Sequence, residues 1–187
     1  MTYTEIIEES KNRIKKQGFN LTLIYDNNLY RHCMNVAYLS IQLGIAMELD
    51  LHELITLGIG ALLHDIGKIE ISSSILNKPD KLTDEERLVI EAHPVMGYQY
   101  LLQYHFPKTV MDIVLYHHEK LDGSGYPAHK TDIPLMVQLV TVADVYEAIR
   151  AKRVYRDANT PKAAYAILKE QKGLNEEIIK LMADLVE

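Results

Sequence analysis

Helical periodicity is the feature of this sequence that most restricts its fold. It is clearest between residues 29 and 47, where side chains suited to one buried face recur every three or four positions: Leu29, His32, Val36, Leu39, Leu43 and Met47. Residues 51–64 are apolar on almost every side, which is typical of a helix in the centre of a core. Further helices are expected over 94–104, 107–118 and 134–150, with two more from about residues 161 and 175. Residues 71–83 are expected to form a loop, and Thr83, with Glu86 three residues later, is expected to cap a helix that begins there. No useful strand pattern interrupts them, so the sequence predicts an all-α fold.

Size and composition indicate one globular unit. The chain has 187 residues, of which 48% are hydrophobic and 25% charged, and it contains no repeat or low-complexity tract. We expect residues 1–27 to form a helical extension that packs on the core or joins two subunits of a homodimer, and residues 28–187 to form the main domain. The longest nearly apolar run, 54–63, is too short to cross a membrane.

Charge and cysteine content restrict partners and location. The net charge of −6 argues against binding to polymeric nucleic acid. The single cysteine, Cys33, excludes an intramolecular disulfide and, with no apolar signal region at the start, favours a reducing, cytoplasmic location. We therefore expect the partner to be a small molecule.

Several histidine and aspartate residues lie on the buried face of an expected helix or at the end of one. Seven potential metal ligands come from five separate segments: His32, His64, Asp65, His93, His117, His118 and Asp144. Each alone has an ordinary structural interpretation, such as a hydrogen-bonded core histidine or a turn aspartate. Together they predict a metal site. Imidazole and carboxylate ligands without a thiolate suit Fe, Mn, Zn, Co or Ni better than Mg or Ca.

The number of ligands favours two metal ions over one. Seven side chains exceed what one ion can use, and the adjacent His117 and His118 point about 100° apart on a helix. Asp65 follows His64 directly and has two oxygens, so we expect it to bridge the ions. Two divalent ions, two carboxylates and a bridging hydroxide leave a charge of roughly +1, which would attract a phosphate, and two-metal sites activate water for displacement at phosphorus.

At this point the motifs resemble a known family. HDIGK at residues 64–68 is similar to the HD phosphohydrolase superfamily, and HPVMG at 93–97 with HHEKLDGSGYP at 117–127 resembles its HD-GYP branch. KPDKLTDEE at 78–86 and DVYEAIRAKRVYR at 144–156 are similar to the same branch. The resemblance implies an HD-domain helical bundle with additional C-terminal helices. It also implies a bacterial phosphodiesterase that hydrolyses cyclic di-GMP to linear pGpG, with GMP after a second cut, using two or three ions, often iron or manganese.

The resemblance also implies roles for individual residues. His32, His64, Asp65 and Asp144 would hold one ion, and Asp65, His93, His117 and His118 the other. Asp65 and Lys68 would be catalytic, with Lys68 on the scissile phosphate. The implied substrate-binding residues, besides Lys68, are Arg153, Arg156, Asp122, Gly123, Gly125, Tyr126 and Pro127. For Arg153 and Arg156 a solvated surface is the alternative, and Tyr126 would either stack on a guanine or brace its loop.

Three positions depart from the family pattern. Asn28 stands where three-metal members have a glutamate, which favours two ions. Glu147 replaces a usual aspartate, and Lys120 stands where arginine is common. These two changes affect the surroundings of the site and leave the seven predicted ligands intact.

Three other functions remain open from the sequence. The chain could be a phosphohydrolase of the same fold acting on another cyclic dinucleotide or a nucleotide. It could be a histidine-rich di-iron protein that binds or activates oxygen, although Lys68 and the GYP loop suit a phosphate ester better. A non-catalytic signalling module is the third, and the complete ligand set argues against it.

Overall fold

The computed structural model describes residues 1–24, 27–151 and 159–186, and in these ranges it contains helices and no strand. The main helices are α1 (Tyr3–Lys16), α2 (Asn27–Ala46), α3 (Leu51–Leu63), α5 (Asp84–Glu91), α6 (His93–Leu101), α7 (Lys108–Tyr116), α8 (Leu135–Arg150), α9 (Pro161–Lys169) and α10 (Glu176–Val186). Shorter segments are the 3₁₀ helices η1 (Leu21–Ile24) and η2 (Ile66–Glu70) and the four-residue helix α4 (Ser73–Leu76). The predicted all-α fold is confirmed.

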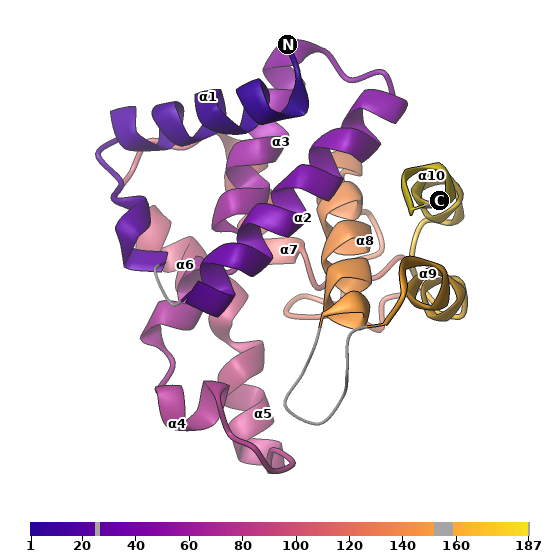
Figure 1. Ribbon diagram of the computed structural model, residues 1–187. Helices are drawn as coiled ribbons and strands as arrows, with labels where there is room; N and C mark the ends of the chain where they lie inside the picture. The colour runs from indigo at the N-terminus through magenta and orange to yellow at the C-terminus, as the bar shows by residue number, and fades with distance from the viewer. Residues whose placement is uncertain (25–26, 152–158, 187) are drawn as a thin grey trace.

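Helix α3 occupies the centre of the molecule (Figure 1). It contacts α1, α2 and α7, and all ten of its residues from Leu54 to Leu63 are buried, as its apolar sequence predicts. Helix α8 packs along α2, and α9 and α10 cover the far side of α8 (Figure 1). The carboxyl end of α3 therefore opens into the space between α2, α6, α7 and α8, where the polar cluster described below lies.

Local sequence signals fix where several helices begin. Asp50 and Glu53 form a reciprocal capping box at the start of α3, with Glu53 N–H 2.8 Å from Asp50 Oδ1. Thr83 and Glu86 do the same at the start of α5, as the sequence predicts. These caps satisfy backbone N–H groups that have no partner inside the helix.

Two segments differ from the sequence-based expectation. Residues 71–83 are expected to form a loop, but they contain α4, whose first turn is capped by the Ser72 hydroxyl. The helix expected over 94–104 begins one residue earlier, at His93, and ends at Leu101. Both differences concern one turn of helix, where capping and neighbouring elements outweigh periodicity.

Helix α1 shares the main core. Ile6, Ile7 and Ile14 are buried, and the buried Ser10 hydroxyl lies 2.8 Å from Ile6 O and 3.2 Å from Ile55 O of α3. The domain boundary expected at residue 27 stays a prediction. In the described part of the chain, no helix combines the length and apolarity needed to cross a bilayer.

Candidate metal centre

All seven predicted ligands lie in one cluster at the carboxyl end of α3. His32 comes from α2 and Asp144 from α8, while His64 and Asp65 follow α3 directly. His93 is the first residue of α6, and His117 and His118 follow the last turn of α7. The side chains of His64, Asp65, His93 and His117 are at most 1% exposed, so the cluster is enclosed by the fold.

The carboxylate of Asp65 lies between two groups of histidines. Its Oδ2 is 3.3 Å from His32 Nε2 and 3.5 Å from His64 Nε2. Its Oδ1 is 3.1 Å from His93 Nε2 and 3.7 Å from His117 Nε2. Each oxygen thus serves a separate half of the cluster, which is the arrangement a bridging carboxylate requires.

Asp144 lies next to the histidines near Asp65 Oδ2 and also approaches one histidine of the other group. Its Oδ1 lies 3.1 Å from His32 Nε2 and 3.9 Å from His64 Nε2, whereas its Oδ2 lies 4.0 Å from His118 Nδ1. Among the described residues, two sets bring ligand atoms within 4.8 Å of one another: His32, His64 and Asp65, and Asp65, His93, His117 and His118. Asp65 belongs to both sets.

Backbone carbonyl groups orient three of the histidines. The Nδ1 atoms of His64, His93 and His117 lie 2.7, 2.6 and 3.0 Å from the carbonyl oxygens of Ala61, Ile90 and Val114, respectively, each three residues earlier. A carbonyl oxygen only accepts, so Nδ1 carries the hydrogen in each ring. In the neutral ring Nε2 then presents a lone pair to the cluster, as metal ligation needs.

Glu147 orients the fourth histidine. Its Oε2 lies 2.6 Å from His32 Nδ1, and its Oε1 accepts a hydrogen bond of 3.0 Å from Asn35 Nδ2. The sequence shows this residue only as a departure from the family pattern and assigns it no role. Its position three residues after Asp144, on the same face of α8, was the available signal.

Burial and neighbouring charge set the protonation of the cluster. Burial lowers the pKa of His64 to about 4, and burial also lowers the pKa of His93 and of His118. These three rings are therefore neutral at pH 7. Burial alone would lower the pKa of His32 as well, but the carboxylates of Asp144, Asp65 and Glu147 raise it overall.

The donor set fits divalent cations. Two ring nitrogens approach each other closely, with His93 Nε2 3.2 Å from His117 Nε2. Asp65 Oδ1 and His118 Nε2 are buried without a hydrogen-bond partner. Buried lone pairs that face one another and lack donors are costly unless a cation lies between them.

Metal uptake is expected to release a proton from His32. The raised pKa keeps His32 charged at pH 7 before an ion binds, and a ligand nitrogen must be deprotonated. Affinity should therefore rise with pH through the neutral range, and about one proton should be released for each centre filled. Titration calorimetry in buffers of different ionisation enthalpy measures that number, and a binding enthalpy independent of the buffer would contradict the expectation.

Replacing Glu147 by Gln should weaken the half of the centre that contains His32. An amide gives His32 Nδ1 a weaker acceptor than a carboxylate, and outer partners of this kind are worth about 10- to 100-fold in metal affinity. The Glu147→Asp variant, with a shorter side chain, should fall between the Gln variant and the original protein. Metal titration of the three proteins tests this order, and equal affinities would show that His32 does not depend on Glu147.

Lys68 lies beside the carboxylate of Asp65. Its Nζ is 2.6 Å from Asp65 Oδ2, and about a quarter of its side chain is exposed (24%). Burial alone would lower the pKa of Lys68, but the carboxylates of Asp65 and Asp144 raise it overall, so the ammonium group stays charged. The predicted contact with a substrate phosphate stays a prediction.

One side-chain ring of the GYP loop contacts a ring of the cluster. The Tyr126 ring stacks on His118, with ring centroids 4.7 Å apart. Asp122 instead accepts hydrogen bonds from Ser124 within the loop, and Gly125 packs against the backbone of residues 118–120. Gly123 has φ of 75°, and Pro127 follows a cis peptide bond. Their predicted contacts with substrate stay predictions, and Arg153 and Arg156 lie outside the described residues.

The core is all-helical in the described part of the chain. It brings together an adjacent His-Asp pair, four further histidines and a second aspartate. These features define a helical domain suited to binding metal ions. The match to the HD domain family extends over residues 3–176, and the chain belongs to that family. The HD domain part of the predicted resemblance is confirmed by this match, and the relatives described next are consistent with its HD-GYP branch.

Two curated relatives act on different cyclic dinucleotides. The cyclic di-GMP phosphodiesterase response regulator RpfG of Xanthomonas campestris is 43% identical over 136 residues, which are 71% of this chain and 35% of that protein. The 3'3'-cGAMP-specific phosphodiesterase 3 of Vibrio cholerae is 43% identical over 112 residues, which are 59% of this chain and 24% of that protein. The chain thus spans about a third or less of the length of these relatives.

A solved structure shares the fold. Bd1817, an HD-GYP-type protein from Bdellovibrio bacteriovorus, superposes with a TM-score of 0.73 at 24% identity, over 98% of this chain and 63% of that one. The additional helices α9 and α10 are therefore included in the shared architecture.

Proposed function

We propose that this protein is a metal-dependent phosphodiesterase that hydrolyses cyclic di-GMP to linear pGpG, with GMP as the product of a second cut. The observation that carries the proposal is the placement of Asp65, whose two oxygens face two separate sets of histidine nitrogens. The similarity to RpfG, named as a cyclic di-GMP phosphodiesterase, supports the choice of substrate.

The proposed ligands divide into two sets that share Asp65. His32, His64 and Asp144 would hold one divalent ion with Asp65, and His93, His117 and His118 would hold the other. We propose Fe or Mn as the ions, with Zn, Co and Ni as alternatives that the same ligand types accept. When bound, two such ions supply Lewis acidity that activates water and stabilises charge on phosphoryl oxygens.

The chain's own residues would position the phosphate. Lys68 keeps its charge next to Asp65 and is partly exposed, so its ammonium group can donate to a phosphoryl oxygen. Asp122, Gly123, Gly125, Tyr126 and Pro127 would form one wall of the substrate site. Arg153 and Arg156 would bind the second phosphate of the ring.

The cellular setting is proposed from chemistry alone. The free, buried thiol of Cys33 is compatible with a reducing cytoplasm. We propose a small-molecule cyclic dinucleotide as the only nucleic-acid-like partner, and the homodimer expected from the sequence stays a prediction.

Hydrolysis of 3'3'-cGAMP is the second candidate function. It is favoured by one observation, the 43% identity to a phosphodiesterase named as specific for that compound. Both candidates use the same cluster, because the ligands act on the phosphodiester and not on the bases. The di-iron oxygen-binding alternative would instead show an optical spectrum that changes under oxygen.

The experiment is an assay of protein loaded separately with Fe(II) and Mn(II). Cyclic di-GMP and 3'3'-cGAMP are supplied in parallel, and products are identified by mass. We expect conversion of cyclic di-GMP to pGpG as the faster reaction. Faster cleavage of 3'3'-cGAMP would select the second candidate, and cleavage of neither compound by protein that holds both ions would reject the proposed function.

A further inference from the structure

His118 differs from the other four histidines of the cluster in how it is held. In His64, His93 and His117, Nδ1 is hydrogen-bonded to a backbone carbonyl oxygen. In His32, Nδ1 is hydrogen-bonded to the Glu147 carboxylate. For His118 no hydrogen bond to either nitrogen is found in the described part of the chain. Its Nε2 is buried without a partner, and its Nδ1 is 4.0 Å from Asp144 Oδ2.

Ring contacts take the place of that hydrogen bond. Tyr126 stacks on His118 with a centroid separation of 4.7 Å and an angle of 28° between the rings. The other ring neighbours are His93, at 5.0 Å and nearly perpendicular, and His117, at 4.1 Å and tilted. These two rings are candidate ligands themselves, so Tyr126 is the ring outside the ligand set that sets the plane of His118.

Backbone contacts of the loop hold Tyr126 next to His118. The Tyr126 N–H donates to His118 O at 3.2 Å, so the two residues are also joined through the backbone. Gly125 makes the approach feasible, because a Cβ there would lie 2.4 Å from His118 O and 2.5 Å from Glu119 Cα.

The other side of the loop is fixed by the buried carboxylate of Glu119. It accepts hydrogen bonds from Ala128 N–H at 2.6 Å and Lys130 N–H at 3.0 Å. The segment that follows Tyr126 is thereby tied to the residue that follows His118. The position of the Tyr126 ring is therefore restrained by backbone contacts on both sides of it.

We propose that Tyr126 is a positioning residue for His118, and through it for the half of the metal centre formed with His93 and His117. This inference rests on the proposed function in one respect, namely that the cluster binds two ions. It assigns the tyrosine of the GYP loop to the metal centre and not to a guanine base. The stacked ring plane carries this role, and the phenol hydroxyl is not needed for it.

The test is a titration of the apoprotein with Mn(II), in which electron paramagnetic resonance counts free ions and detects a coupled pair. Tyr126→Phe keeps the ring, whereas Tyr126→Leu and Tyr126→Met remove it. We expect the Phe variant to bind two ions as the original protein does. The Leu and Met variants should bind the first ion normally and the second about 10- to 100-fold more weakly, with loss of the coupled-pair signal.

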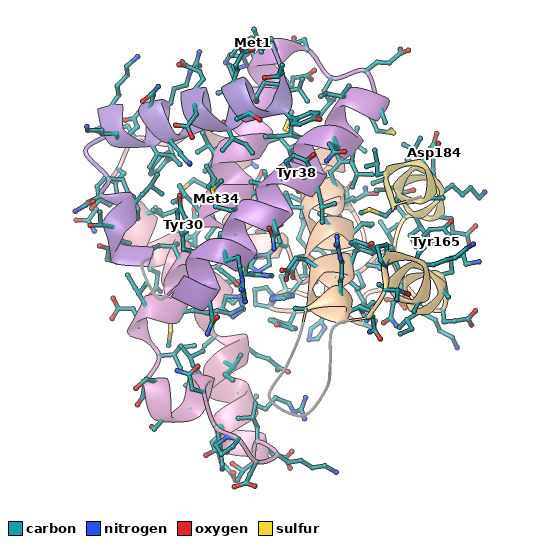
Figure 2. The ribbon with its side chains drawn as sticks, viewed as in Figure 1. Met1, Tyr30, Met34, Tyr38, Tyr165 and Asp184 are labelled. Atoms are coloured by element: carbon teal, nitrogen blue, oxygen red, sulfur yellow. The ribbon has the colours of Figure 1, made fainter. Side chains whose placement is uncertain are left out.

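Tyr165 provides a matched control. It lies on α9 (Figure 2), where it is partly buried against the core and belongs to neither group of candidate ligands, so Tyr165→Leu should leave both affinities unchanged. Thermal unfolding of each apoprotein is recorded first. If the Tyr126→Leu and Tyr126→Met proteins do not fold, the role of Tyr126 is to stabilise the loop, and the inference is overturned.

The remaining outcomes separate the inference from the proposed function. Normal binding of both ions by the Leu and Met variants would overturn the positioning role, and a rise in KM for cyclic di-GMP alone would indicate base stacking. A Phe variant as defective as the Leu variant would overturn the role of the ring. An original protein that binds no Mn(II), Fe(II) or Zn(II) would reject the proposed function and this inference with it.

Discussion

Replacing Asp65 by Asn is expected to abolish the two-ion centre and lower phosphodiesterase activity more than about 1,000-fold. An amide offers one oxygen and one NH₂ group, so it cannot serve both sets of histidines that Asp65 Oδ1 and Oδ2 now face. Loss of a metal that activates the nucleophile removes several kcal/mol of transition-state stabilisation, which corresponds to this factor. Metal content by mass spectrometry and turnover of cyclic di-GMP measure the two effects in the same preparation.

Asp184→Asn provides the matched control for this change. Asp184 is exposed on α10 (Figure 2), so the same loss of one negative charge should leave metal content and activity unaltered. Asp65→Asn protein that retains two ions would contradict the bridging role. Retained activity with one ion would limit that role to metal affinity and would remove the case for a two-ion reaction.

Replacing Gly67 by Ala is expected to destabilise the protein by about 3 kcal/mol and to weaken metal binding. A Cβ at this position would lie 2.0 Å from His93 O and 2.5 Å from Gly97 N. Both atoms belong to the backbone of α6, so no side-chain rotation relieves the overlap and η2 must separate from α6. That separation would carry His93 away from Asp65.

Urea unfolding in the presence of a chelator measures the loss in free energy of unfolding. Titration with Mn(II) measures the loss of metal affinity expected from the displacement of His93. Gly18→Ala provides the comparison, because Gly18 has φ of 80° and a Cβ at this position would meet no other atom within 4 Å. It should cost about 1 kcal/mol from the backbone conformation alone and leave metal binding unchanged. A Gly67→Ala protein as stable as the original would show that the contact between η2 and α6 is loose.

Helix positions and ligand types could be predicted because they depend on short stretches of sequence. The three- and four-residue spacing of α2, the apolar character of α3 and the cap at Thr83 each involve residues within about one or two turns of each other. The position of Asp65 between two groups of histidines was also predictable, since it rests on one residue with two oxygens next to His64. Helix α4 was missed because four residues carry no periodic signal.

The sequence by itself determined that this protein is helical, that it carries seven potential metal ligands, and which motifs link it to the HD domain family. Only the tertiary structure decided which nitrogen of each histidine faces the cluster, that Glu147 holds His32 across 115 residues of chain, and that Tyr126 stacks on His118. The physical reason is that periodicity and capping are local properties of the backbone. The partner of a side chain on a distant segment depends on how whole helices pack, to within a fraction of an ångström.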